Sequence, residues 1–328
     1  MKKLLLTLFA IQAALYVGAQ QDAQFSQNRF LSTSINPGAS GIKGMDCFGL
    51  VARQQWIGFE GAPTTAMLTY ESALDKYNSG FGAVMVYDKI GFEQNLFLKA
   101  NYAYHFTLPN GAKLGLGIDA GIISKKLSGD FVAGNPTDPD ILSLKGQNSL
   151  NFDLGFGAFY YTNTLYFGVS GQKLVPQKIN WGTSEPQIRP HTYFMGGYNY
   201  EINADFDLKP SFLVKTDFTS TQVDVNLMAE YKKLLWLGAS YRIQDAIVAN
   251  MGMYIKNVAP NPIKVGLAYD FTTSNLRDDG VFNFPAPSTE IKNGNRSVGS
   301  VELYLGYCWA KPEKPNFDHY VDPLFLNN

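Results

Sequence analysis

The stretch Leu150-Asn151-Phe152-Asp153-Leu154-Gly155-Phe156-Gly157 alternates a large apolar side chain with a glycine or a polar residue at every step. Successive side chains of a β-strand point to opposite faces, so one face of this stretch is wholly apolar. The same alternation recurs in stretches 95–105, 114–122, 263–271 and 301–309. A soluble β-sandwich would carry Lys, Glu and Thr on its other face, whereas here that face is rich in glycine. The pattern therefore favours strands that turn an apolar face toward lipid and a glycine-rich face toward a crowded interior.

The composition agrees with such a protein. Of the 328 residues, 14% are aromatic and 17% are charged, against roughly 25% charged in a soluble globular domain. The mean hydropathy of −0.12 excludes a helical membrane protein with many spans. The formal net charge is −1, and it falls to −3 without residues 1–19, which carry two lysines and no acid. Because no basic excess exists to neutralise a phosphate backbone, we do not expect nucleic acid as a partner.

Residues 1–19 have the organisation of a secretory signal peptide. Lys2 and Lys3 form a positive start, an apolar run to Val17 follows, and cleavage is expected after Ala19. The alternative is a retained membrane anchor, for which the run is short. No cysteine stands near the cleavage position, which argues against a bacterial lipoprotein. We expect an exported chain that crosses the membrane with strands, because no later apolar run is long enough for a helical span.

The predicted fold class is all-β: a closed antiparallel transmembrane outer-membrane β-barrel of about fourteen strands with an N-terminal segment that enters or plugs the lumen. Fourteen stretches carry a strand pattern. They lie near 45–58, 64–73, 80–88, 94–107, 112–125, 149–161, 164–172, 190–201, 207–216, 221–230, 234–243, 246–255, 262–271 and 298–309.

The predicted organisation is a signal peptide at 1–19, the N-terminal segment at 20–43, the barrel at 44–310 and a periplasmic tail at 311–328. Short connections alternate with longer ones such as 127–148, 174–189 and 272–296. Outer-membrane barrels have short periplasmic turns and longer outer loops. We therefore expect an outer-membrane location with both termini in the periplasm.

Four short motifs follow one another near the N-terminus. They are Gln24-Phe25-Ser26-Gln27, Asn36-Pro37-Gly38-Ala39-Ser40-Gly41, Arg53-Gln54-Gln55-Trp56 and Ala62-Pro63-Thr64. Their residues and order resemble the PorP/SprF family, whose usual runs are close to QFSQ, NPAYAG, RxQW and APxT. The second motif departs slightly, because it reads NPGASG. Shorter similarities, such as YFGVS at 166–170, extend the resemblance across the mature chain.

This resemblance implies an outer-membrane component of the type IX secretion system of Bacteroidetes, associated with protein export, surface adhesins and gliding. The implied function is non-enzymatic: the barrel scaffolds or anchors secreted surface proteins together with periplasmic and outer-membrane partners. The alternative is a diffusion porin or small-molecule transporter, which would need a wide, water-filled lumen. Bulky inward residues such as Phe97, Trp236 and Tyr254 argue against it.

Simple chemistry suggests how the motifs act. Phe25 offers one aromatic anchor in a polar segment, and Asn36-Pro37 starts a turn. Alternation places Arg53 and Gln55 on the inward face, where an arginine needs carboxylate or carbonyl partners. Two interpretations stay open: Arg53, Gln55 and Trp56 hold the plug in place, or they bind a secretion partner.

The sequence offers no catalytic or metal site. The three histidines, His105, His191 and His319, have no metal-ligand spacing, and neither a GxSxG motif nor a P-loop occurs. We expect His105 to be an interfacial ring at a strand end. No cofactor and no small-molecule substrate are predicted.

The two cysteines, Cys47 and Cys308, predict a disulfide. They lie near the start of the first expected strand and the end of the last, which are antiparallel neighbours at the seam of an even-stranded barrel. Both share the inward face of their strands, and directly opposed residues come within disulfide range. An exported chain can keep the bond. The alternative is two buried free thiols, which a bulge or a one-residue shift would produce.

Overall fold

The computed structural model describes residues 23–128, 146–179, 187–273 and 298–309. Three short helices precede the strands: η1 (Asn28–Phe30), α2 (Ser32–Ile35) and η2 (Pro37–Ala39). A fourth, η3 (Asp75–Tyr77), lies in the turn between the second and third strands. No helix in these ranges is long and apolar enough to cross a membrane. The strands of the wall are β1 (Asp46–Gln54), β2 (Thr64–Leu74), β3 (Ser79–Ile90), β4 (Glu93–Thr107), β5 (Lys113–Leu127), β6 (Asn148–Tyr161), β7 (Leu165–Gln172), β10 (His191–Tyr198), β11 (Tyr200–Glu201), β12 (Phe206–Thr216), β13 (Thr221–Tyr231), β14 (Leu235–Arg242), β15 (Ala246–Ile255), β16 (Ile263–Thr272) and β17 (Ser300–Trp309).

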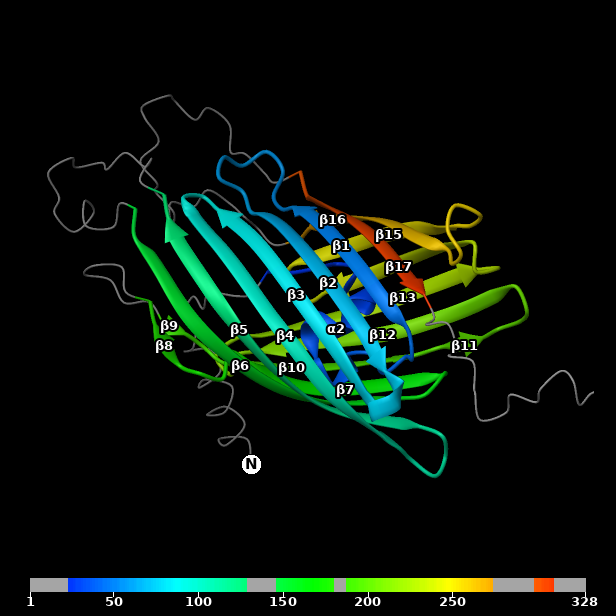
Figure 1. Cartoon of the computed structure of the whole chain (residues 1–328). Coiled ribbons are helices and arrows are strands. Elements are labelled where there is room, and N and C mark those ends of the chain that lie inside the picture. The colour runs from blue at the N-terminus through cyan, green and yellow to red at the C-terminus, as the bar shows by residue number, and fades with distance from the viewer. Residues whose placement is uncertain (1–22, 129–145, 180–186, 274–297, 310–328) are drawn as a thin grey trace, which may run out of the picture.

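These strands form one closed antiparallel ring (Figure 1). Each pairs with its neighbours along the chain, and β1 pairs with β17. β7 pairs with β10 across the long β7–β10 connection, and β10 pairs with β12 on its other side. The two-residue β11 continues β10 after Asn199. Counted as one strand, β10 and β11 bring the number of strands in the wall to fourteen. A separate two-stranded ribbon, β8 (Gln177–Lys178) with β9 (Gln187–Ile188), lies in that connection. The predicted fourteen-stranded barrel is confirmed, although β1 ends at Gln54 rather than at residue 58.

The alternation seen in the sequence divides outside from inside. Apolar residues of the strands are exposed on the outer surface, as for Ile118, which is 65% exposed. The next residue, Asp119, is 3% exposed and faces inward. The barrel thus presents an apolar band to lipid and keeps its charges inside, as expected for an outer-membrane barrel.

The two ends of the barrel differ in their connections. We call the end with η3 and the turns at 108–112, 162–164, 232–234 and 256–262 the short-turn end. The opposite end, here the loop end, carries the three longest connections, β5–β6, β7–β10 and β16–β17. It also has very short turns, such as Gly91-Phe92 between β3 and β4.

The described part of the N-terminal segment lies within the ring of strands, where Figure 1 shows α2 between the near and far walls. Ser26 hydrogen-bonds Asp270 near the loop end of β16, and Gly38 approaches Gly115 near the short-turn end of β5. The segment therefore runs along the lumen from the loop end toward the short-turn end, and β1 then begins at the short-turn end.

Glycines on the inward face of the wall make this path possible. A Cβ at Gly117 would lie 2.4 Å from the Gly38 nitrogen, and one at Gly80 would lie 1.9 Å from the Ser40 carbonyl oxygen. Both neighbours are backbone atoms, which cannot rotate away as a side chain can. The glycine-rich inner face predicted from the sequence is thus the surface on which the segment's backbone packs.

Candidate functional site

The first motif of the chain places all four of its residues against inward groups of the wall near the loop end. Gln24 donates a side-chain hydrogen bond to Gln222, and Phe25 packs against a cluster that includes Leu31 and Met67. Ser26 Oγ donates to the carboxylate of Asp270 at 2.7 and 2.9 Å. The segment is therefore attached to β13 and β16 by its side chains.

Glu302 on β17 receives the backbone of the same motif. Its side chain is fully buried, and its carboxylate accepts the N–H groups of Ser26 at 2.7 Å and Gln27 at 2.8 Å. Arg53 Nη1 lies 3.2 Å from the same carboxylate. A buried carboxylate is costly unless donors surround it, and here the segment supplies two of the three donors.

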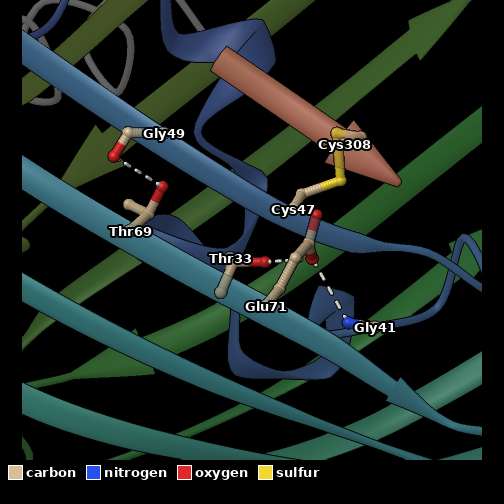
Figure 2. Close-up of a disulfide and its surroundings, with 7 residues drawn as sticks. All are labelled: Thr33, Gly41, Cys47, Gly49, Thr69, Glu71 and Cys308. Carbon is tan, nitrogen blue, oxygen red and sulfur yellow. Dashed lines mark hydrogen bonds between the residues drawn. A yellow bond between two sulfur atoms is a disulfide. The ribbon is translucent and has the colours of Figure 1, made fainter. Parts of the chain in front are cut away.

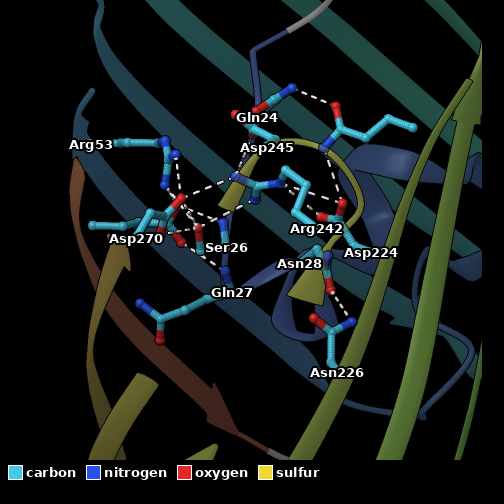
Figure 3. A network of polar contacts seen from close by, with 12 residues as sticks. Gln24, Ser26, Gln27, Asn28, Arg53, Asp224, Asn226, Arg242, Asp245 and Asp270 are labelled. Atoms are coloured by element: carbon cyan, nitrogen blue, oxygen red, sulfur yellow. Dashed lines mark hydrogen bonds and ion pairs between the residues drawn. The ribbon is translucent and has the colours of Figure 1, made fainter. Parts of the chain in front are cut away.

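Two buried arginines complete this network (Figure 3). Arg53 on β1 binds Asp270 at 2.7 Å and donates to Ser26 Oγ at 2.8 Å. Arg242 at the end of β14 binds Asp270 at 3.0 Å and Asp224 at 3.3 Å. Arginine suits such a site because its planar fork serves several acceptors at once. We call Arg53, Arg242, Asp224, Asp270, Glu302 and Ser26 the arginine network.

The second motif holds the segment near the short-turn end. Asn36 is fully buried, and its Nδ2 donates to the carbonyl oxygens of Ala158 on β6 at 2.9 Å and Val169 on β7 at 3.0 Å. Its Oδ1 accepts the N–H of Gly38 at 2.9 Å, which closes the turn that Asn36-Pro37 predicts. One amide side chain thus joins the turn to two strands.

The remaining motif residues lie at the loop end, outside the lumen contacts. Gln55 follows the end of β1, and its N–H donates to the carbonyl oxygen of Pro63 at 2.9 Å. Trp56 has φ of 45°, and its N–H donates to Ser300 Oγ at 3.2 Å. Ala62 and Thr64 flank Pro63 where β2 begins. The expectation that Gln55 shares the inward strand face of Arg53 is wrong, because the strand ends one residue earlier.

Sequence reasoning missed many inward residues that hold the segment. His105 was expected at the membrane interface, yet it is buried and its Nε2 lies 3.0 Å from the Ser40 carbonyl oxygen. Alternation already placed His105 on the polar face of its strand, which was the usable signal. Other such contacts include Glu71 with Thr33 and Gly41, Lys99 with Ser34, Asn101 with Thr33, Lys113 with Ile42, and Ser170 and Gln172 with Ile35.

Two cavities lie on either side of the N-terminal segment. The loop-end cavity has a volume of about 910 Å³ and is lined by residues including Phe25, Asp88, Lys125 and His191. The turn-end cavity has a volume of about 220 Å³ and is lined by residues including Cys47, Lys264 and Tyr304. Leu31 lines both, so the segment forms part of the wall between them.

The seam between β1 and β17 carries the two cysteines beside the turn-end cavity (Figure 2). Cys47 and Cys308 are register partners with Cα atoms 4.1 Å apart, and their sulfur atoms are bonded as a disulfide. Glu71, the register partner of Cys47 on β2, accepts hydrogen bonds from Thr33 at 2.5 Å and Gly41 at 3.2 Å. The bond therefore lies close to where the segment meets the wall.

Comparison with known proteins identifies the family. The family model described as type IX secretion system membrane protein PorP/SprF matches residues 17–284. The chain belongs to the PorP/SprF family. The match includes all four N-terminal motifs, Arg242 and Asp270. Glu302, Cys308 and the rest of β17 lie beyond it. No curated protein matches the chain.

Solved outer-membrane proteins resemble this PorP/SprF chain in fold. They include a mutant of the TodX monoaromatic hydrocarbon channel, with a TM-score of 0.49 and 9% identity over 86% of this chain and 94% of that one. The Pseudomonas putida toluene transporter TodX has a TM-score of 0.46 and 10% identity over 90% and 96%. The Acinetobacter baumannii outer membrane protein Omp33 has a TM-score of 0.42 and 8% identity over 81% and 99%. These likenesses concern the fold alone.

The charges of the arginine network are joined to one another and to the N-terminal segment. PorP/SprF is a family of secretion-system membrane proteins and not a known enzyme family. Within the described ranges, no three His, Cys, Asp or Glu side chains are grouped so that they could hold a metal ion.

Proposed function

We propose that this chain is a non-enzymatic outer-membrane barrel of the type IX secretion system that anchors an exported surface protein. In this proposal the loop end faces outward and holds the exported protein. The short-turn end and the tail at 311–328 face the periplasm and bind other secretion components. The tail lies outside the described residues, and its alternating Lys-Pro-Glu-Lys-Pro start favours an extended spacer. A frayed tail without a partner is the alternative.

The main support is the set of bonds between the N-terminal segment and the wall. Residues 24–42 contact strands around the ring, from β1, β2 and β17 to β6 and β7, through buried side chains. A lumen occupied in this way suits a scaffold better than a diffusion channel, which needs a continuous water-filled path. We assign residues 20–43 the role of a plug that closes the lumen.

Affinity purification from native outer membranes tests the anchoring role. The tagged full chain should recover secretion components and one exported surface protein, identified by mass spectrometry. A matched chain truncated after Trp309 should still fold and retain the surface protein but lose periplasmic components. If the full chain recovers neither class of partner, the anchoring role is wrong; if truncation loses nothing, the docking role of the tail is wrong.

A second candidate is a diffusion porin or small-molecule transporter. The loop-end cavity of about 910 Å³ favours it, because a small solute would enter there. Single-channel recording of the purified protein distinguishes the two. The plug predicts no large steady conductance in the full chain and a clear increase when residues 20–43 are deleted. A large steady conductance of the full chain would favour the porin.

A further inference from the structure

Lys264 faces the turn-end cavity without an anionic partner. Its ammonium lies 5.8 Å from the centre of the Phe30 ring, and no hydrogen bond or ion pair joins it to any described residue. A ring face compensates a lysine charge less well than a carboxylate does. A cation held inside a barrel in this way is short of one acceptor.

Tyr304 presents an unused donor beside this lysine. The residue is 6% exposed and its ring stacks on Phe30 at 4.8 Å between centroids, yet its hydroxyl hydrogen-bonds no described residue. The hydroxyl lies over Gly306, which is the register partner of Lys264. Buried tyrosine hydroxyls usually have a hydrogen-bond partner. The Lys264 ammonium and the Tyr304 hydroxyl are therefore two neighbouring donors that both lack an acceptor.

The charges around the cavity leave one positive charge in excess. Lys43 and Lys264 line it together with one acid, Glu71, whose carboxylate already accepts from Thr33 and Gly41. Next to the cavity, Lys209 pairs with Glu230 at 2.9 Å and with Asp207 at 3.7 Å, and the Tyr254 hydroxyl donates to Glu230, so both of these carboxylates already have partners. A single negative charge would therefore balance the charged side chains that line the cavity.

We propose that the turn-end cavity binds one carboxylate group, held by Lys264 and Tyr304 with Lys43 at its rim. A carboxylate brings one charge, whereas a phosphate monoester brings about 1.5 to 2 at neutral pH and would overcompensate the site. The volume of about 220 Å³ accommodates an acidic side chain or a small free acid together with water. The exposed Lys43 marks the entrance at the short-turn end. This site is separate from the loop end, where the exported protein is proposed to bind.

Ligand-observed NMR titration of the purified full chain in a neutral detergent tests the site. The probes are the blocked peptide Ac-Gly-Glu-Glu-Gly-NH2 against its Gln counterpart, and glutarate against glutaramide, with inorganic phosphate as a third arm. Binding of either carboxylate, but not of its amide counterpart, is expected. The peptide and glutarate arms show whether the group comes from a polypeptide or from a free acid.

Three variants assign the binding to the cavity. Lys264→Met removes the charge at similar volume and should weaken carboxylate binding at least tenfold, since a hydrogen bond to a charged group contributes about 1.5–3 kcal/mol. Tyr304→Phe removes only the hydroxyl and should weaken it several-fold. Lys232→Met makes the same charge change at the same end of the barrel, in an exposed turn where Lys232 lies 3.5 Å from Asp205, and should leave binding unchanged.

Several outcomes would overturn this site. They are no carboxylate binding by the folded wild-type chain, equal loss in Lys264→Met and Lys232→Met, and tighter binding of phosphate than of either carboxylate. Heat-modifiable gel mobility verifies that each variant is folded, and Tyr304→Phe decides the case if Lys264→Met does not fold. Because the assay involves no exported protein, its failure would leave the anchoring role untouched.

Discussion

At the loop end the N-terminal segment is held mainly by charged side chains. At the short-turn end it also packs directly against backbone atoms of the wall, beside side-chain contacts from Glu71, His105 and Lys113. Ser26 and Gln27 enter the arginine network, in which Arg53 and Arg242 share Asp270. Asn36 and Gly38 instead meet carbonyl oxygens and glycines of the wall. The attachment at the loop end therefore depends on the balance of buried charges. The attachment at the short-turn end also depends on the space between the segment's backbone and the wall. Substitutions can separate these two dependences.

Removing one arginine should have the largest effect. Arg53→Met leaves Asp270 and Glu302 without their shared cation, and breaking a buried ion pair from one side costs about 3–5 kcal/mol. Urea unfolding of the barrel in detergent measures the loss. Lys232→Met is the control, because its exposed pair with Asp205 contributes about 0–1 kcal/mol. Equal midpoints for the two variants would contradict the role given to the network.

Removing the disulfide between β1 and β17 should have the second-largest effect on stability. The bond between Cys47 and Cys308 closes a loop of 261 residues near the short-turn attachment. Native disulfides contribute about 2–4 kcal/mol, so Cys47→Ser with Cys308→Ser should lower the free energy of unfolding by that amount.

Alkylation mass spectrometry of protein isolated without reductant should find no free thiol, and a non-reducing gel should show altered mobility after reduction. Two alkylated cysteines in the isolated wild type would instead establish the pair of buried free thiols. The reduced wild type serves as the matched control for the serine variant.

Adding a methyl group to the wall near the short-turn end should lower the stability of the protein by a smaller amount. The new Cβ of Gly117→Ala would lie 2.4 Å from the Gly38 nitrogen, and overpacking of this kind costs about 1–3 kcal/mol. Gly171→Ala is the control, since its Cβ would first meet the flexible Leu174 side chain at 3.1 Å. Limited proteolysis should release the segment more readily in Gly117→Ala. Equal protection in both variants would show that the close approach does not hold the segment.

The smallest effect is expected at Gln55, which shares a sequence motif with Arg53 but not its environment. Gln55→Ala should change unfolding by no more than about 0.5 kcal/mol, since its side chain lies beyond the end of β1. A loss as large as that of Arg53→Met would mean that the motif acts as one unit on the plug. A loss of partner recovery without a loss of stability would favour the interpretation that it binds a secretion partner.

The sequence predicted the strands of the barrel wall better than the arrangement of the residues inside the lumen. Alternation identifies strands and faces because a strand has a fixed period of two, and it placed Cys47 opposite Cys308 from strand positions alone. The meeting of Arg53, Arg242 and Asp270 was not predictable in this way. These residues come from three strands, and alternation gives the face of a side chain but not its height in the barrel.

The path of the N-terminal segment through the lumen could not be predicted from the sequence either. The motifs predicted that residues 20–43 enter or cap the lumen, but not that residues 24–42 run from the loop end toward the short-turn end. That path depends on inward glycines such as Gly80 and Gly117, contributed by two different strands. His105 was misplaced for a related reason: its position near a strand end suggested the interface, while its buried contact with Ser40 follows from the segment's path.

The position of the segment inside the closed ring bears on how the barrel assembles. Residues 24–42 lie inside a ring that the pairing of β1 with β17 closes, and both strands carry residues that hold the segment, Arg53 and Glu302. Threading these residues through a finished ring would mean passing the Gly38 turn between walls with almost no free space. In the simpler route, the β-hairpins assemble around residues 24–42 before the barrel closes. The N-terminal segment then acts as an internal template for closure.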